Sequence, residues 1–212
     1  CNSSKSIDFR EDIVRKNLNA WDFERGQLLV HIGAWVLMPN HFHIYITPNP
    51  SLRKSDFRKN QITEYMRKVS TSYSKYFNKK YKRTGGLFEG KFRDNHVAKD
   101  TYAKYLFSYI HLNPIKLFDS KWKENGIKNL KKAREFLKTY TWSSYLDYKN
   151  TKRVQSKILN LKNFPEYFKS VEDFDTEIFE WLNLNPAEEG LPQKNLRDTI
   201  FFPIMRPRGD IK

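Results

Sequence analysis

Hydrophobic residues follow two different periods along the chain. Leu28–Met38 is a short, nearly continuous apolar run rich in strand-forming residues, which predicts a β-strand. His41–Thr47 alternates between the two sides of a pleated strand, and Pro39-Asn40 separates the two runs as a hairpin turn. Across Ile62–Phe77 apolar residues recur every three or four positions, which is typical of one face of an amphipathic helix.

Further elements follow from capping and breaking residues. A helix is expected over residues 9–24, and residues 87–97 are expected to be an extended or hairpin segment. Asp100 is a suitable N-cap for a helix over residues 101–113, which Pro114 is expected to end. The sheet should therefore be largely antiparallel.

These elements predict an α+β fold in which an antiparallel sheet has helices packed on one or both of its faces. Residues beyond Thr141 are expected to form loops and short helices, with a small acidic helical unit at Val171–Leu184. We accordingly divide the chain into a main domain, residues 1–150, and a helical, acidic C-terminal extension, residues 151–212.

Composition narrows the class of protein. The 212 residues carry a net charge of +15, 16% are aromatic, and Cys1 is the single cysteine. These values argue against a disordered chain and exclude a scaffold of internal disulfides, and no apolar stretch approaches the ~20 residues of a membrane span. No signal-like segment opens the sequence, so we expect a cytoplasmic, soluble protein. A basic surface attracts polyanions, with nucleic acid first and acidic membranes second.

The positive charge is concentrated in one part of the chain. Residues 51–93 carry 13 Lys and Arg against three acidic residues, whereas residues 165–190 carry eight acidic residues against Lys169 alone. A charge run is often only a solvated face, but so one-sided a cluster favours a binding surface.

Two short patterns carry candidate chemistry. His41 and His43 are at positions i and i+2 of a predicted strand, so both imidazoles lie on one face and can reach one metal ion, unless they are simply surface histidines. Tyr109 and Asn113 are at i and i+4 of a predicted helix and share a face. Spacing alone would make Tyr109 a core aromatic residue and Asn113 a helix-end residue.

Four segments together resemble a known family. The chain is similar to the HUH single-strand transposases, and most of all to the REP-associated tyrosine transposase branch of the insertion-sequence transposase superfamily. The resemblance covers roughly residues 25–148, and the segments that carry it are Leu37–Ile44 (LMPNHFHI), Gly86–Arg93 (GLFEGKFR), Tyr109–Pro114 (YIHLNP) and Trp142–Tyr145 (WSSY).

The resemblance implies a fold and a site. It implies a ferredoxin-like, RRM-like HUH domain over residues 1–150, although the family fold begins with a strand for which only residues 2–8 are present here. It implies that His41, His43 and Asn113 bind a divalent cation, Mg²⁺ or Mn²⁺, and that Tyr109 is the nucleophile. Glu89 stands where relatives often have Gln, which leaves open whether it is a further ligand or a surface residue.

The implied activity is cleavage and rejoining of single-stranded DNA through a 5′-phosphotyrosine, with a REP-like hairpin as substrate. The expected DNA-binding residues are Arg67, Lys68, Lys75, Lys79, Lys80, Tyr81, Lys82, Arg83, Lys91 and Arg93. Tyr81 is the better candidate for base stacking, whereas Tyr73, Tyr76 and Phe77 are expected to belong mostly to the core. Trp142 and Tyr145 are expected to be packing residues.

Alternatives remain at this stage. The chain is expected to act as a monomer or homodimer on single-stranded or hairpin DNA, without a membrane partner. The competing functions are an HUH nickase of the replication-initiator or relaxase type, a non-catalytic single-strand nucleic-acid-binding module, and a metal-dependent hydrolase. A hydrolase would need further His or Asp ligands, and the chain has five histidines in total.

Overall fold

A computed structural model describes residues 1–4, 21, 26–52, 60–97 and 99–180. The chain divides into two compact units, the first formed by Cys1–Ile32 with Ile46–Phe88 and the second by Gly33–Tyr45 with Glu89–Lys212. Apart from residue 21, the helix expected over residues 9–24 lies outside the described residues, as do most of the residues available for a preceding strand. The division into residues 1–150 and 151–212 stays a prediction.

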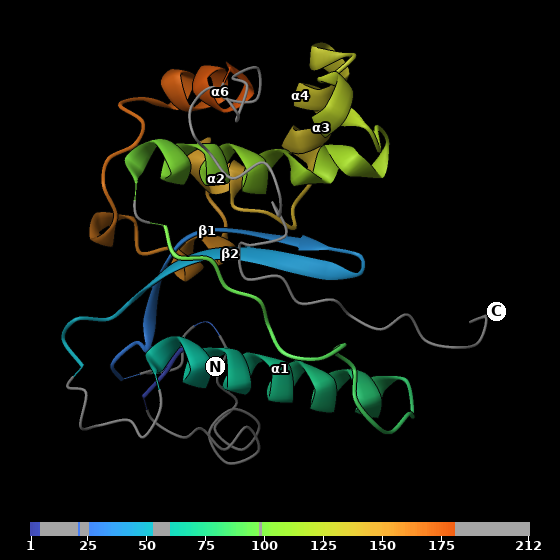
Figure 1. Cartoon of the computed structure of the whole chain (residues 1–212), viewed down its shortest axis with the longest axis vertical. Helices are drawn as coiled ribbons and strands as arrows, with labels where there is room; N and C mark the ends of the chain where they lie inside the picture. The colour runs from blue at the N-terminus through green and yellow to red at the C-terminus, as the bar shows by residue number, and fades with distance from the viewer. Residues whose placement is uncertain (5–20, 22–25, 53–59, 98, 181–212) are drawn as a thin grey trace. The chain divides into compact units, whose positions relative to one another are not determined.

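The predicted hairpin is present. Strands β1 (Val30–Met38) and β2 (His41–Pro48) form a two-stranded antiparallel sheet, so the described residues have an α+β fold (Figure 1). On β1, Val36 also forms an isolated antiparallel bridge with Ser143, and the Leu37 N–H donates to the Trp142 carbonyl at 2.8 Å. The sequence motif WSSY therefore lies against β1 in the second unit.

Residues 87–97, expected to be an extended or hairpin segment, contain no named strand. Phe88 and Arg93 have isolated bridge geometry. The segment contains Gly90 in a left-handed conformation, with φ of +81°, which interrupts an extended backbone. The sheet of the described residues is thus smaller than expected.

Helix α2 (Asp100–Leu112) runs through the middle of the second unit. Its buried residues are Tyr102, Ala103 and every residue from Tyr105 to Leu112, because the helix packs against other elements on several sides. Figure 1 shows α2 between the hairpin and α6 (Val171–Glu180), and α2 contacts α6. Lys99, not Asp100, occupies the N-cap, and it makes no side-chain cap.

Pro114 changes the helix type instead of stopping the chain. The 3₁₀ helix η3 (Asn113–Leu117) follows α2 directly, with Pro114 in its first turn, where a helix does not require the missing N–H. Asn113 is therefore at the junction between α2 and η3. This junction brings the segments that follow back over the C-terminal end of α2.

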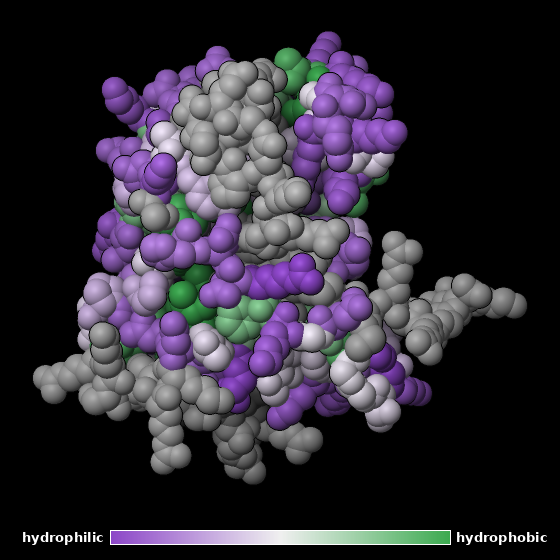
Figure 2. All heavy atoms as spheres, in the orientation of Figure 1, coloured by the Kyte–Doolittle hydropathy of each residue, from purple (hydrophilic) through white to green (hydrophobic). Residues whose placement is uncertain are grey.

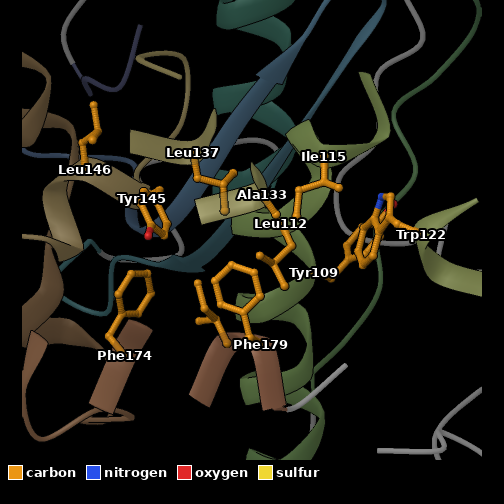
Figure 3. Packing of buried hydrophobic residues seen from close by; sticks show 11 residues of the cluster. Tyr109, Leu112, Ile115, Trp122, Ala133, Leu137, Tyr145, Leu146, Phe174 and Phe179 are labelled. Atoms are coloured by element: carbon orange, nitrogen blue, oxygen red, sulfur yellow. The ribbon is translucent and has the colours of Figure 1, made fainter. Parts of the chain in front are cut away.

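A second layer covers that end of α2. It consists of α3 (Trp122–Asn125), α4 (Leu130–Thr139) and α5 (Tyr145–Tyr148). Apolar residues of these three helices form one buried cluster with α2 and α6 (Figure 3). The 3₁₀ helices η4 (Val154–Ile158) and η5 (Leu161–Asn163) follow in the chain and contribute no buried residue. Tyr145 is fully buried as expected, whereas Trp142 is 61% exposed and is not a packing residue.

The acidic charge of α6 is partly neutralised inside the second unit. Asp175 pairs with Arg134 at 2.6 Å and accepts a hydrogen bond from the Tyr145 hydroxyl at 2.5 Å, while Glu177 pairs with Lys104 at 3.3 Å. The predicted acidic helix is confirmed for residues 171–180. These ion pairs hold α6 against α2 and α4.

The first unit is built on α1 (Gln61–Lys80). The Asn60 side chain accepts a hydrogen bond from the Ile62 N–H and caps the helix, as expected for asparagine at this position. Tyr65 and Met66 are its buried residues. Tyr73 and Tyr76 are 40% and 58% exposed, so the expectation that they belong mostly to the core is wrong.

Hydrophilic residues make up most of the described surface on the face drawn in Figure 2. Among the described helices, none has both the length and the apolar character needed to cross a membrane.

Candidate nucleophile and metal site

The two histidines of β2 lie side by side and inside the second unit. Their ring centroids are 5.0 Å apart in an edge-on arrangement, and both side chains are buried, His43 almost completely. Phe42 between them is also buried, on the opposite face of the strand. They are therefore not the surface histidines of the alternative interpretation.

Helix α2 brings Tyr109 against this pair. The Tyr109 ring centroid is 5.2 Å from that of His43, and both residues belong to the second unit of the same chain. Asn113, one turn further along, is 1% exposed and hydrogen-bonds the Tyr109 side chain. We call His41, His43, Tyr109 and Asn113 the site cluster. A single chain thus brings all four expected residues together.

His111 fixes the position of this part of α2. One ring nitrogen, Nδ1, is 2.8 Å from the Phe107 carbonyl, and Nε2 is 2.7 Å from the Ser144 hydroxyl. Ser144 in turn accepts a hydrogen bond from the Trp35 N–H of β1 at 2.9 Å. The motif residues His111 and Ser144 therefore link α2 to β1, which positions the helix that carries Tyr109.

Both histidines are held in the neutral form. Burial lowers the pKa of His41 to about 4, with further lowering by the positive charges of Lys116 and Lys123. Burial also lowers the pKa of His43 well below its usual value, and His41, Lys123 and Lys116 act in the same direction. Neutral imidazole is the form that binds a metal ion, because its lone pair is free of a proton.

The hydrogen bond of His41 defines which nitrogen faces the cluster. Its Nδ1 is 2.7 Å from the side-chain oxygen of Asn40, so Nδ1 carries the proton and donates it. Nε2 then carries the lone pair. A hydrogen bond of this kind to the second nitrogen is how metal-binding histidines are usually oriented.

In the chain without a substrate, the Tyr109 phenol is protonated. Burial raises the pKa of Tyr109 to about 12, and the hydrogen bond from Asn113 lowers it by a smaller amount. The loss of hydration is the larger effect in the free chain, so deprotonation must be assisted when a substrate binds.

Two lysines of the site were missed in the sequence. The Lys123 ammonium nitrogen lies 3.9 Å from the centroid of the Tyr109 ring, and Lys116 acts electrostatically on both histidines. Lys123 comes from α3 and Lys116 from η3. No motif marked them, because a four-residue helix has too little periodicity to show which side chain faces α2.

The donor set fits a divalent cation. The buried Asn113 Oδ1 has no partner in hydrogen-bond geometry and so is an available oxygen ligand beside two neutral imidazoles. Mn²⁺ accepts such a mixed set, whereas Mg²⁺ prefers oxygen. Within the described part of the chain, no three His, Cys, Asp or Glu side chains gather as a metal site, so any cation bound here relies on the Asn113 oxygen.

The expected DNA-binding residues divide between the two units. Lys75, Lys79, Lys80, Tyr81 and Lys82 are exposed on α1 and just after it, in the first unit, whereas Lys91 and Arg93 are exposed in the second. Glu89 is exposed as well, and belongs to the second unit.

Three of the expected DNA-binding residues already have partners inside the first unit. Arg67 pairs with Glu64 at 2.6 Å, Lys68 donates to the Ser3 carbonyl at 2.7 Å, and Arg83 donates to the Gly86 carbonyl at 3.3 Å. The exposed lysines are therefore the stronger candidates for phosphate contacts.

No protein-family model, curated protein or solved structure matches this chain. The likeness to HUH transposases accordingly rests on the four sequence motifs, and an assignment of activity rests on those motifs and the geometry of the site cluster.

Proposed function

We propose that this chain is a metal-dependent, single-strand DNA transposase of the HUH type. The observation that carries the proposal is the contact between the Tyr109 and His43 rings, whose centroids are 5.2 Å apart, with Asn113 buried beside Tyr109 and His41. A non-catalytic binding module has no need of this combination, because burying a phenol, two imidazoles and a carboxamide together is unfavourable without a role for them.

In the proposed reaction Tyr109 Oη attacks a backbone phosphorus of single-stranded DNA. The new Oη–P bond forms as the P–O3′ bond breaks, the phenol proton passes to solvent, and the released 3′-oxygen takes up a proton. The product is a 5′-phosphotyrosine, whose ester bond retains the energy of the broken link. A second 3′-hydroxyl can then reverse the step and join strands.

The site residues divide this work. His41, His43 and Asn113 would hold the divalent cation, which supplies Lewis-acid polarisation of the phosphate when bound. Tyr109 supplies the nucleophile. The exposed lysines of α1 would contact DNA phosphates, and the exposed Tyr76 and Tyr81 beside Lys80 would stack on unpaired bases.

The test is a covalent adduct between protein and DNA. Labelled single-stranded hairpin DNA is incubated with the protein and Mn²⁺, then denatured and separated by mass. We expect an adduct in the wild type, its loss in Tyr109→Phe, and its retention in Tyr105→Phe, a matched control because Tyr105 is buried on the same helix.

Other outcomes are equally informative. Cleavage of the DNA without a covalent adduct would contradict the tyrosine mechanism. Tight DNA binding without cleavage would favour the single-strand binding module. An adduct that persists in Tyr109→Phe would assign the nucleophile to another residue.

A further inference from the structure

The ammonium group of Lys123 is held over the face of the proposed nucleophile. Although Lys123 as a residue is exposed, its Nζ lies 3.9 Å from the Tyr109 ring centroid and 5.9 Å from that of Trp122. These aromatic rings take the place of water around the ammonium, which lowers the pKa of Lys123 to about 8. A lysine on the outside of a helix is usually extended into solvent instead.

Lys116 adds a second positive charge near the two histidines and Lys123. It lowers the pKa of Lys123 as well as those of His41 and His43. Within the described residues neither lysine forms an ion pair, and the carboxylate that acts on Lys123 is that of its neighbour Glu124. The Lys123 ammonium is thus held over the Tyr109 ring without an ion pair among the described residues, and the charge of Lys116 repels it.

We propose that Lys123 and Lys116 form an anion subsite at Tyr109, and that its ligand is a DNA phosphodiester. This inference rests on the proposed function, since it names the residues that hold the phosphate on which Tyr109 would act. A phosphodiester carries one negative charge on two unsubstituted oxygens, and lysine binds such oxygens as a point charge with three donors. The two lysines would hold the phosphorus near the phenol and offset negative charge on the attacking oxygen.

A cation–π contact that only packs α3 against α2 is the competing explanation for Lys123. It requires no ligand and gives Lys116 no role. The two explanations differ in a measurement that needs neither DNA nor chemistry, namely the response of Tyr109 to a small phosphodiester.

The experiment titrates dimethyl phosphate into protein labelled with ¹³C in its tyrosine rings, without divalent cations. The Tyr109 signals are assigned by their loss in Tyr109→Phe. We expect them to shift on addition of the probe, with an apparent affinity that Lys123→Met weakens by roughly tenfold or more. Lys116→Met should weaken it by a smaller factor, and Lys123→Arg should retain it.

Lys121→Met is the matched control. Lys121 is exposed two residues before Lys123 and is not among the charges that act on the two histidines. An unchanged affinity for dimethyl phosphate in Lys121→Met supports a specific subsite formed by Lys123 and Lys116. Equal weakening in Lys121→Met and Lys123→Met overturns it in favour of general charge attraction, and unshifted Tyr109 signals in the wild type overturn it outright.

A parallel measurement separates this inference from the proposed function. The rate of adduct formation with hairpin DNA and Mn²⁺ is compared in the wild type and in Lys123→Met. If dimethyl phosphate binds through Lys123 but the wild type forms no adduct, the subsite stands and the transposase proposal fails. If both proteins form the adduct at the same rate, the transposase proposal stands and the subsite does not serve it.

Discussion

The site cluster and the outer face of α1 both combine polar and aromatic side chains, but those of the site cluster are buried and those of α1 are exposed. In the site cluster, four polar side chains are buried and each is fixed by neighbouring elements. On α1 and at its C-cap, Tyr73, Tyr76, Lys80 and Tyr81 are exposed, and Tyr73 and Tyr81 also contact the Phe77 ring. We call these four residues the α1 face.

This difference in burial suits the two regions to different tasks, namely holding reacting groups in fixed positions and binding DNA. Burial removes water and leaves each group of the site cluster few alternative positions, which chemistry at phosphorus requires. The α1 face keeps its hydration and adapts to many base sequences, but its charges are screened by salt. Changes in the second unit near the site cluster should therefore alter stability, and changes on the α1 face should alter DNA affinity alone.

The largest effect is expected from truncation of Phe107, which packs against β1 residues in the core of the second unit. It is 1% exposed and its ring meets those of Tyr45, Tyr148 and Tyr167 at 5.1 to 5.5 Å. Phe107→Ala should lower the free energy of unfolding by about 3–5 kcal/mol through lost burial and a cavity. Tyr76→Ala on the α1 face should change it by less than about 0.5 kcal/mol.

Urea unfolding followed by circular dichroism measures both variants. Equal losses would contradict the comparison, because they would mean that the α1 face is packed as tightly as the core of the second unit.

A second prediction concerns the divalent cation. Mn²⁺ at a concentration 100 times its Kd should stabilise the wild type by about 2.7 kcal/mol, because it binds the folded chain alone. His43→Gln should lose this increment, whereas His96→Gln should keep it, since His96 is an exposed histidine outside the site cluster. The quantity to compare is the gain in unfolding free energy on adding Mn²⁺, so a change in basal stability does not affect the test. A gain that survives in His43→Gln would place the cation elsewhere.

The third prediction is a loss of stability in acid. Burial lowers the pKa of His111 to about 3 in the folded chain, against about 6.5 when unfolded. Below pH 6.5 the unfolded chain therefore binds a proton that the folded chain does not, so the stability present above pH 6.5 is lost as the pH falls. His41 and His43 act in the same direction.

Each such histidine contributes a slope of up to about 1.4 kcal/mol per pH unit below pH 6.5. Urea unfolding at pH 7.5, 6.0 and 5.0 measures the slope, and His111→Gln should reduce it by one histidine's share. Stability that rises on acidification would contradict the buried, neutral state of these histidines.

These residues also show which features of the fold and the site could be predicted from the sequence. The hairpin and α2 could be predicted because their hydrophobic periods are long and Pro39-Asn40 marks the turn. The convergence of His43 and Tyr109 could be predicted only through the family resemblance, because they are far apart in sequence. Local spacing makes each of them an ordinary strand or helix residue.

Other features could not be predicted for physical reasons. Lys123 reaches Tyr109 through the path of η3 and α3, which no periodic pattern encodes. The apolar stripe of α1 continues past Met66, but Tyr73 and Tyr76 remain 40% and 58% exposed although their spacing is that of core positions. Periodicity shows which residues share a face, whereas burial depends on what packs against it.

The smallest expected effect tests the α1 face itself. Lys80 is exposed and lies 5.8 Å from the Tyr76 ring centroid and 5.5 Å from that of Tyr81, so its charge is placed beside two rings on which bases can stack. If Lys80 neutralises one phosphate, Lys80→Gln should reduce the slope of log affinity against log salt by roughly 0.7. Its affinity for single-stranded DNA at low salt should fall only a few-fold.

Lys138→Gln provides the control for that measurement. Lys138 is an exposed lysine of α4 that already pairs with Glu135 at 2.9 Å, so removing its charge should leave the salt slope as it is. Fluorescence anisotropy with labelled oligonucleotide over a range of salt concentrations gives both slopes. If the two variants lower the slope equally, net charge and not the arrangement of the α1 face governs DNA affinity. A loss confined to Lys80→Gln means that the cation beside Tyr76 and Tyr81 follows the DNA backbone.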